Sequence, residues 1–200
     1  MKLYKFRPLG ENKHLERIKD IINSGFYCCD FLSFNDMNEG VFSVNVHNVN
    51  IDVSKKKKYR ICSFSGISAL NNQLMWGHYA NTGMGIVIEI EVSDCHEIKQ
   101  VRYSNVTTNL NSIEAVLTRK SEDWQYEDEF RYLSKNTDEK VKIGKITKIY
   151  FGMPYKNLIN YDDIKKKHSK LKKYLELKEE LEKFCVTENV EYNDYEFNHQ

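Results

Sequence analysis

GIVIEIEV, residues 85–92, is the most strand-like stretch of this 200-residue chain, and it predicts how the neighbouring segments are organised. Ile86, Val87 and Ile88 are consecutive apolar residues, so both faces of the strand would be covered. A strand that is covered on both faces belongs in the middle of a sheet. This stretch therefore predicts a central strand.

The preceding residues, QLMWGHYANTGMG (73–85), combine bulky side chains with glycines. The bulky cluster consists of Trp76, His78 and Tyr79. Glycine destabilises a chain unless the backbone needs its freedom, and Gly83 and Gly85 allow a sharp turn into the central strand. A short helix over 71–80 would then cap the sheet, either as part of an aromatic core or as part of a ligand site.

Within that helix, Trp76 and Tyr79 are three positions apart and share a side, whereas His78 is turned away from Tyr79. We expect Trp76 to be a packing residue. We expect His78 to be at least partly buried and hydrogen-bonded to the first strand or to the turn containing Asn35 and Asp36. The sequence leaves open whether His78 serves a ligand or the core.

Six other segments have the alternating or apolar pattern of strands. They are LYKFR (3–7), FYCCDFLSF (26–34), YRICSFS (59–65), IKQVRYS (98–104), EDEFRYLS (127–134) and KITKIYFG (145–152). Residues 98–104 follow the central strand closely and are expected to form a hairpin with it. Together, these segments predict a mixed or antiparallel sheet of about seven strands.

Helical segments flank these strands, which predicts an α+β fold. HLERIKDIINSG (14–25) carries its apolar residues on one stripe and ends at Gly25, a residue typical of helix C-caps. Residues 112–120 also suit a helix. The Lys/Glu-rich segment from Tyr161 to Phe184 predicts one long C-terminal helix.

VEYNDYEF (190–197) predicts a last edge strand after this helix. No interior linker or repeat divides the chain. We therefore expect a single domain over 1–200, with a core over 1–152 and the C-terminal helix and edge strand over 153–200.

Composition limits the classes of partner and the cellular location. A net charge of +1 argues against general attraction to nucleic acid or anionic membranes. The runs Lys55–Lys58 and Lys165–Lys167 are expected to be solvated faces. The chain has neither an apolar run of the ~20 residues that a membrane span needs nor a signal-peptide pattern, which predicts a cytoplasmic protein.

Five cysteines without a Cys-x-x-Cys pair predict buried, reduced thiols rather than a disulfide framework or a zinc site.

The stretch YEDEFRY (126–132) contains the strongest candidates for chemistry. Strand alternation would put Glu127, Glu129 and Arg131 on one face. Two carboxylates this close perturb each other's ionisation, which is common in active sites. The alternative is a surface ladder in which Arg131 pairs with acids on its own or a neighbouring strand.

Two other polar features are candidates for ligand contacts. Arg7 ends the first strand just before Pro8, where its guanidinium can bind phosphate or carboxylate. The turn FNDMNEG (34–40) carries a polar cluster of Asn35, Asp36 and Glu39. Such turns mostly satisfy their own backbone, and no further ligands can be assigned, so no metal site is expected.

The order of these motifs resembles a bacterial family, domain of unknown function 2971, which includes AbiGi-like abortive-infection proteins. The pattern runs through LYKFR, FND-x-x-E, SFS, LMWGHYA, W-x-YEDEFR and I-x-x-IYFG, over residues 3–152. Two departures are that Met37 and Asn38 replace the usual Pro and Phe, and that Ser63 stands where cysteine is common. The resemblance implies phage defence or a toxin-like role, with a cognate antitoxin or another defence partner.

More distantly, the segment order is similar to that of ADP-ribosyltransferases. Those proteins begin with a strand carrying His or Arg, continue with a tyrosine-bearing helix and an apolar strand, and end with a glutamate near the last core strands. The similarity is one of architecture and motif order rather than a signature. It implies a split sheet, NAD as the ADP-ribose donor and a macromolecular acceptor.

The transferase resemblance also implies roles for individual residues. Glu129 would accept a hydrogen bond from the nicotinamide ribose and stabilise an oxocarbenium-like transition state, while Glu127 would orient the acceptor or act as its base. Arg7 would hold a phosphate or ribose. The other cofactor contacts would come from Tyr4, Ser63, Ser65, Trp76, His78 and Tyr79. The alternative is a non-catalytic module that uses the same polar groups to bind a small anion or a protein segment.

Overall fold

The computed structural model describes residues 1–30, 58–93, 97–106, 112–135, 138–156, 158 and 160–197. The FNDMNEG turn with Asn35, Asp36 and Glu39 lies outside these residues. Cys95, most of the Lys55–Lys58 run and the end of the segment 26–34 also lie outside them.

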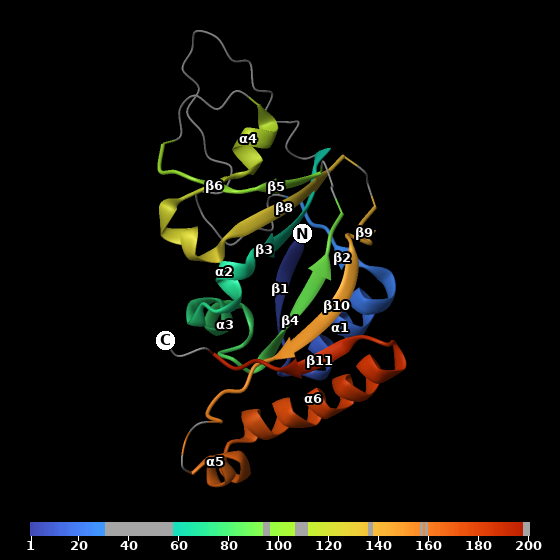
Figure 1. Ribbon diagram of the computed structural model, residues 1–200, viewed down its shortest axis with the longest axis vertical. Helices are drawn as coiled ribbons and strands as arrows, with labels where there is room; N and C mark the ends of the chain where they lie inside the picture. Colours follow the sequence, from blue (N-terminus) through green and yellow to red (C-terminus); the bar gives the residue numbers. More distant parts are fainter. Residues whose placement is uncertain are drawn as a thin grey trace.

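A seven-stranded mixed sheet lies at the centre of this α+β fold. Its strands are β1 (Lys2–Pro8), β3 (Arg60–Ser65), β4 (Gly85–Glu91), β5 (Ile98–Gln100), β8 (Glu129–Ser134), β10 (Lys145–Phe151) and β11 (Glu191–Asp194). They are arranged in the order β11-β10-β4-β1-β3-β8-β5 (Figure 1). Two small ladders accompany it: β2 (Phe26–Tyr27) with β9 (Lys140–Val141), and β6 (Arg102–Tyr103) with β7 (Arg119–Lys120).

The central position predicted for residues 85–92 is confirmed. β4 pairs antiparallel with β1 on one side and with β10 on the other, and every residue from Gly85 to Ile90 is buried. The predicted hairpin with residues 98–104 is wrong, because β1 and β10 occupy both edges of β4. β5 instead pairs with β8 at the far edge of the sheet, and β6 pairs with β7.

Two groups of helices cover opposite faces of the sheet. The helix α1 (Asn12–Ser24) packs with the C-terminal helix α6 (Ser169–Thr187) against the face that carries Leu3, Ile86 and Ile88. The helices α2 (Ile67–Leu70) and α3 (Gln73–Tyr79) pack against the other face, which carries Tyr4, Phe6 and Val87. This division follows directly from strand alternation, because consecutive residues of β1 and β4 point to opposite faces.

The helix predicted over 14–25 is present as α1 and ends where the sequence indicates. Gly25 follows it with φ at 104°, and its N–H donates to the carbonyl of Ile21. A Cβ at this position would lie 2.6 Å from the carbonyl oxygen of Val141. Glycine is therefore required here both by the backbone angle and by the close approach of another strand.

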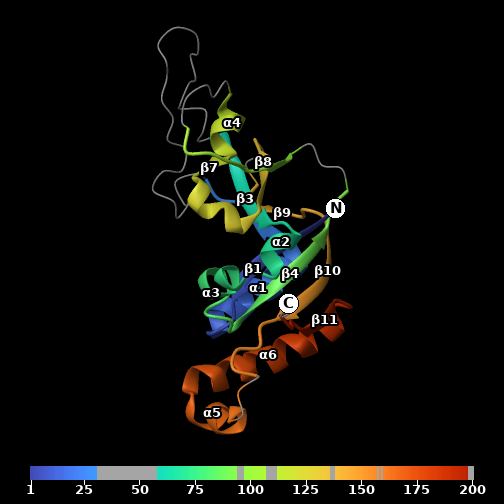
Figure 2. The ribbon, with the colours of Figure 1, turned by 60° about the vertical axis from the view of Figure 1, so that its left-hand side comes forward.

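The C-terminal segment differs from the expected single long helix. It forms α5 (Tyr161–Lys167) and α6, separated by His168. The backbone of His168 is extended, and its ring accepts a hydrogen bond from the N–H of Leu171 at 3.1 Å, so this residue caps α6 and interrupts the helix. The predicted edge strand is confirmed: β11 pairs in parallel with β10 and runs alongside α6 (Figure 1, Figure 2).

The helix predicted over 112–120 is shorter than expected. It spans only Ile113–Leu117 (α4), and the chain then turns into β7. A 3-10 helix, η3 (Glu122–Glu127), follows β7 and leads into β8. Within the described ranges, each helix is too short or too polar to cross a lipid bilayer.

Candidate functional site

The sheet opens at the junction of β1 and β3. These strands are neighbours, yet they pair at one point only, where Tyr4 stands opposite Ser65. Beyond this point, the edge of β3 pairs with the segment that follows β2. Between the two pairing points, the ammonium of Lys5 donates to the backbone carbonyl of Ser63 and so takes the position of a strand N–H. A pocket occupies this opening.

The pocket has a volume of about 300 Å³ and is lined by both strands and by the elements above them. This size is at the lower end of small-molecule sites. Its polar lining comes from Tyr4, Lys5, Arg7, Ser63, Ser65, Tyr79, Lys120, Glu127 and Glu129. Most of the residues that the sequence indicates as cofactor-binding or catalytic therefore meet in one pocket.

Lys120 joins the two candidate carboxylates. Its ammonium lies 2.6 Å from Oε2 of Glu127 and 3.2 Å from Oε2 of Glu129, and the exposed fraction of each glutamate is only 4%. Burial alone would lower the pKa of Lys120, but the charges of Glu129 and Glu127 outweigh it and raise the pKa. Lys120 is therefore the positive centre of a buried ionic cluster.

Arg131 pairs with Glu129 but is not one of the residues that line the pocket. Its Nε lies 2.8 Å from Oε1 and its Nη2 3.0 Å from Oε2 of the carboxylate, while Nη1 donates to the carbonyl of Leu117. Burial opposes ionisation of Glu129, but the charge and hydrogen bonds of Arg131 outweigh it and lower the pKa to about 2. The predicted pairing of Arg131 with an acid of its own strand is thus present, but the surface location is wrong, because these side chains are buried.

Glu127 lies in the pocket beside Glu129, but not because the two residues alternate along one strand. It ends η3 rather than beginning β8, and Asp128 between the two glutamates adopts left-handed angles of φ 44° and ψ 52°. This turn brings the two side chains to the same cation. The hydroxyl of Tyr79 donates to the second oxygen of Glu127. Burial, and then the bond to Glu127, raises the pKa of Tyr79, so the phenol stays protonated.

The opposite part of the pocket is cationic. Arg7 is partly buried, and within the described part of the chain its Nε is buried without a hydrogen-bond partner. Burial lowers the pKa of both Arg7 and Lys5, since removing a cation from water is costly. A bound anion would compensate for this cost. Sequence pattern alone does not single out Lys5 as a site residue, although it shares a strand face with Arg7.

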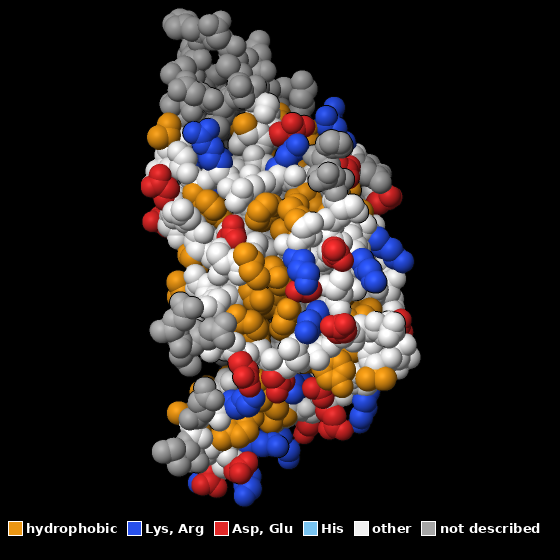
Figure 3. Space-filling view, in the orientation of Figure 1, with side chains coloured by type: hydrophobic (Ala, Val, Ile, Leu, Met, Phe, Trp, Pro, Cys, Tyr) orange, Lys and Arg blue, Asp and Glu red, His pale blue; other side chains and the backbone are white. Residues whose placement is uncertain are grey.

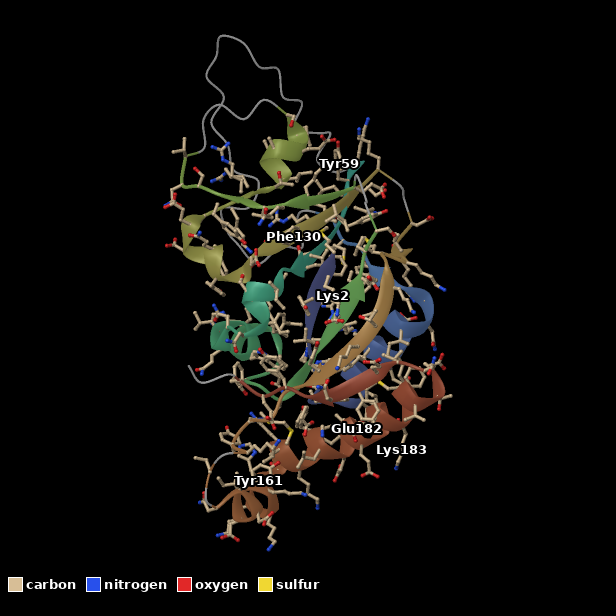
Figure 4. All side chains as sticks on the ribbon, in the orientation of Figure 1. Lys2, Tyr59, Phe130, Tyr161, Glu182 and Lys183 are labelled. Carbon is tan, nitrogen blue, oxygen red and sulfur yellow. The ribbon has the colours of Figure 1, made fainter. Side chains whose placement is uncertain are left out.

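Tyr4 also lines the pocket, but its hydroxyl lies near a second buried carboxylate, Glu89. That carboxylate accepts hydrogen bonds from Lys2 at 2.9 Å, Thr147 at 2.8 Å and Tyr150 at 3.0 Å (Lys2 is labelled in Figure 4). Burial and the charge of Glu89 raise the pKa of Tyr4 to about 12. Glu89 is well satisfied by these partners, so we assign it a structural role.

Trp76 does not line the pocket, in contrast to its predicted cofactor contact. Its exposed fraction is 2%, its Nε1 donates to the carbonyl of Leu70 at 2.9 Å, and its ring packs on Phe6 and Tyr195. The packing role is thus confirmed. Hydrophobic side chains gather over the middle of the face seen in Figure 3. Five partly buried aromatic residues pack against the buried cluster that contains Trp76: Tyr79, Tyr126, Tyr150, Tyr195 and Phe197.

The sequence predicts that His78 is at least partly buried, but the residue is exposed, and its Nδ1 shares a hydrogen bond of 3.1 Å with the hydroxyl of Tyr126. No bond joins it to the first strand among the described residues, and the alternative partner, the turn with Asn35 and Asp36, lies outside them. The reason is helix geometry. Met75 and Trp76 form the buried face of α3, which packs on the sheet, and His78 projects from the other side of the helix. His78 is therefore outside the pocket.

Lys120 is the main site residue that sequence pattern does not reveal. No local signal marks it, because its segment is expected to be helical and its partners lie on other elements. In the part of the chain that the structure describes, no group of three or more His, Cys, Asp and Glu side chains could hold a metal ion. The polar groups of the pocket are suited instead to an organic ligand with anionic and hydroxyl groups.

Comparison with known proteins found no protein that is similar to this chain. No protein-family model matches the chain, and neither a curated protein nor a solved structure is significantly similar to it.

Proposed function

We propose that the protein is an ADP-ribosyltransferase-like enzyme that binds NAD in the pocket between β1 and β3. The observation that carries this proposal is the arrangement of charged groups in the pocket, in which Arg7 and Lys5 form a cationic part and Glu127 and Glu129, paired with Lys120, supply carboxylate acceptors. NAD has matching chemistry: an anionic pyrophosphate beside a ribose with hydroxyl donors. The opening of the sheet at this junction supports a split-sheet, transferase-like architecture.

Arg7 would bind a phosphate of the dinucleotide. Because its buried Nε has no hydrogen-bond partner among the described residues, the guanidinium can donate to a phosphate oxygen without breaking an existing pair. Lys5 adds charge but is already bonded to the Ser63 carbonyl. A pocket of about 300 Å³ has room for the nicotinamide riboside half, so the adenosine half would extend outside it.

Glu129 would act on the ribose. Its carboxylate is ionised at neutral pH and is fixed by Arg131, so it can accept a hydrogen bond from a ribose hydroxyl without reorganising. As the bond to nicotinamide breaks, positive charge develops on the ribose, and a fixed carboxylate stabilises it. Glu127 would orient the acceptor, or accept its proton once Lys120 moves away from it.

The resemblance to the abortive-infection family supports a cytoplasmic effector of phage defence or a toxin-like system. In that setting the acceptor would be a macromolecule of the infected cell, and a cognate antitoxin or defence partner would restrain the activity. The family relation and the cellular setting are parts of the proposal.

A second candidate function is favoured by one observation. Both carboxylates already have cationic partners, Lys120 and Arg131, before any ligand is present. Such a cluster can serve as a rigid support for a non-catalytic module that binds a small anion through Arg7. The two functions differ in whether nicotinamide is released.

The experiment combines binding with turnover. Isothermal titration with NAD and with ADP-ribose is compared between the wild type, Arg7→Gln and Arg102→Gln; Arg102 is an exposed arginine of β6 that does not line the pocket and is the matched control. We expect Arg7→Gln to weaken NAD binding about ten-fold or more and Arg102→Gln to leave it unchanged. Incubation of the wild type with labelled NAD and cell lysate should release nicotinamide and label a macromolecule.

The outcomes separate the candidates. If ADP-ribose binds through Arg7 but no nicotinamide is released from NAD, the protein is a non-catalytic binding module rather than an enzyme. Absence of binding to either nucleotide, or binding that Arg7→Gln leaves unchanged, would refute the assignment of the pocket to NAD.

A further inference from the structure

Cys28 and Cys62 face each other across a pair of antiparallel segments next to the pocket. Cys29 and Ile61 exchange both backbone hydrogen bonds, at 3.0 and 2.8 Å. The preceding residue of one segment then stands opposite the following residue of the other, so Cys28 and Cys62 form a non-hydrogen-bonded pair. Cα atoms in such a pair are about 4.5 Å apart, a separation that a disulfide can span.

The two thiols are free and differ in their tendency to ionise. The neighbouring Cys28 thiol, and then the charges of Lys5 and Arg7, lower the pKa of Cys62, although burial opposes this. The neighbouring Cys62 and burial raise the pKa of Cys28, whose Sγ lies 3.8 Å from the carbonyl oxygen of Phe26. Cys62 is therefore the more readily ionised thiol of the pair.

Access to the two sulfurs also differs. Cys62 lines the pocket, whereas Cys28 has an exposed fraction of 0% and is not part of the lining. Cys29 lines the pocket as well, but burial raises its pKa and its thiol is directed to the Ile61 carbonyl. A small molecule in the pocket would therefore meet the sulfur of Cys62, with the thiol of Cys28 behind it.

We propose that Cys62 is a hydroperoxide-reactive cysteine and that Cys28 is its resolving partner, so that oxidation produces a Cys28–Cys62 disulfide beside the pocket. The geometry of the pair and the cationic surroundings carry this inference independently of the proposed NAD chemistry.

The chemistry proceeds in two balanced steps. The Cys62 sulfur attacks one oxygen of the hydroperoxide, the O–O bond breaks, and the sulfur is oxidised to a sulfenic acid while the other oxygen leaves as water or an alcohol after gaining a proton. The Cys28 sulfur then displaces the hydroxyl group from Cys62. A sulfur–sulfur bond forms, and the hydroxyl leaves as water with the proton of Cys28.

Lys5 and Arg7 would assist the first step, because they stabilise the attacking thiolate. They line the pocket together with Cys62, so a negatively charged hydroperoxide or peroxide adduct would meet the same cations. A disulfide would remove the negative charge of Cys62 from their surroundings.

The test uses the full chain treated with hydrogen peroxide and analysed by mass spectrometry without reduction. We expect an intact mass lower by two hydrogens and a peptide in which Cys28 is linked to Cys62. Cys28→Ser should accumulate a sulfenic acid on Cys62 that dimedone traps, and Cys62→Ser should form neither product. Cys185→Ser is the matched control, since this buried cysteine lies on α6, and it should behave as the wild type.

A second measurement needs no variant. With limiting iodoacetamide at neutral pH, the reduced wild type should be alkylated on Cys62 at least about ten-fold faster than on Cys185, because only the thiolate reacts. Equal rates at the two cysteines would overturn the proposal. A peroxide-induced disulfide that joins Cys28 to Cys29, or a Cys28→Ser protein in which dimedone traps nothing on Cys62, would also overturn it.

Discussion

Arg131 holds the carboxylate of Glu129 through two hydrogen bonds, from Nε to Oε1 at 2.8 Å and from Nη2 to Oε2 at 3.0 Å. The guanidinium has no exposed surface, and the carboxylate is 4% exposed. Desolvation of each charge is unfavourable, so the stability of the fold depends on the pair remaining complete.

Acid should therefore destabilise the protein. The pKa of Glu129 is about 2 in the folded state and 4.5 for the group in isolation, so its stabilisation is present above about pH 4.5 and is lost as the pH falls toward 2. The difference between the two pKa values corresponds to a contribution of roughly 3 kcal/mol to the free energy of unfolding at neutral pH. Urea denaturation over a pH series measures this loss.

Glu129→Gln isolates this effect from the other carboxylates. The variant should be less stable by roughly 3 kcal/mol at pH 7, since Arg131 and Lys120 lose a charged partner, and the difference from the wild type should shrink toward pH 2. A difference that is the same at pH 7 and pH 2 would contradict the role of the Arg131 pair.

Removing Lys120 should be costly. Lys120→Met leaves Glu127 without its cation inside a buried site, and we expect a loss of about 3–5 kcal/mol in the free energy of unfolding. The matched control is Lys183→Met, which removes an exposed ion pair with Glu179 on α6 (Lys183 is labelled in Figure 4) and should leave the free energy of unfolding almost unchanged. Chemical denaturation of both variants measures the contrast, and equal losses would refute the buried ionic cluster.

Trp76 and His78 should behave oppositely despite being two residues apart. Trp76→Ala opens a cavity under α3 and should cost about 3–5 kcal/mol. His78→Ala removes an exposed ring and should change stability by less than about 0.5 kcal/mol. Thermal denaturation compares the two. A large loss of stability in His78→Ala would show that the ring is packed.

Replacing Gly85 and Gly77 with alanine should change the stability of the protein in opposite directions. A Cβ on Gly85 would lie 2.5 Å from the carbonyl oxygen of Arg7 and 2.7 Å from that of Ala80, so Gly85→Ala should destabilise the protein by about 1–3 kcal/mol or more. A Cβ on Gly77 would meet nothing within 4 Å, and Gly77→Ala in the helix should stabilise by about 0.5–1 kcal/mol. Melting temperatures that shift in the same direction in both variants would contradict the distinction between the two glycines.

These glycines explain why the stretch 73–85 mixes bulky residues with glycine. Gly85 lets β4 begin in direct contact with the backbone of β1 and with the end of α3, and Gly83 turns the chain with φ at 85°. Trp76 can then pack over the start of the sheet. Gly77 has no such requirement, and we have no physical account of it.

Much of the architecture follows from local sequence pattern. The apolar run Ile86–Ile88 predicted a central strand, the spacing in residues 14–25 predicted α1, and alternation in 3–7 correctly separated Leu3 from Tyr4. Arg7, Tyr79 and Glu129, which the sequence indicates as site candidates, line one pocket. These patterns predict helices and strands because the residues that form the buried face of one element are close together in the sequence.

Only the tertiary structure decided which segments meet. Proximity in sequence suggested that 98–104 pairs with β4, but β1 and β10 compete for the same edges and both pair along more of its length. Lys120 reaches Glu127 and Glu129 only because β7, η3 and β8 fold together, and Cys28 reaches Cys62 only because β3 takes a second partner beyond β1. Ion pairs and strand pairs join residues far apart in the chain. Their formation depends on the free energy of the whole packed arrangement, which no local window of sequence contains.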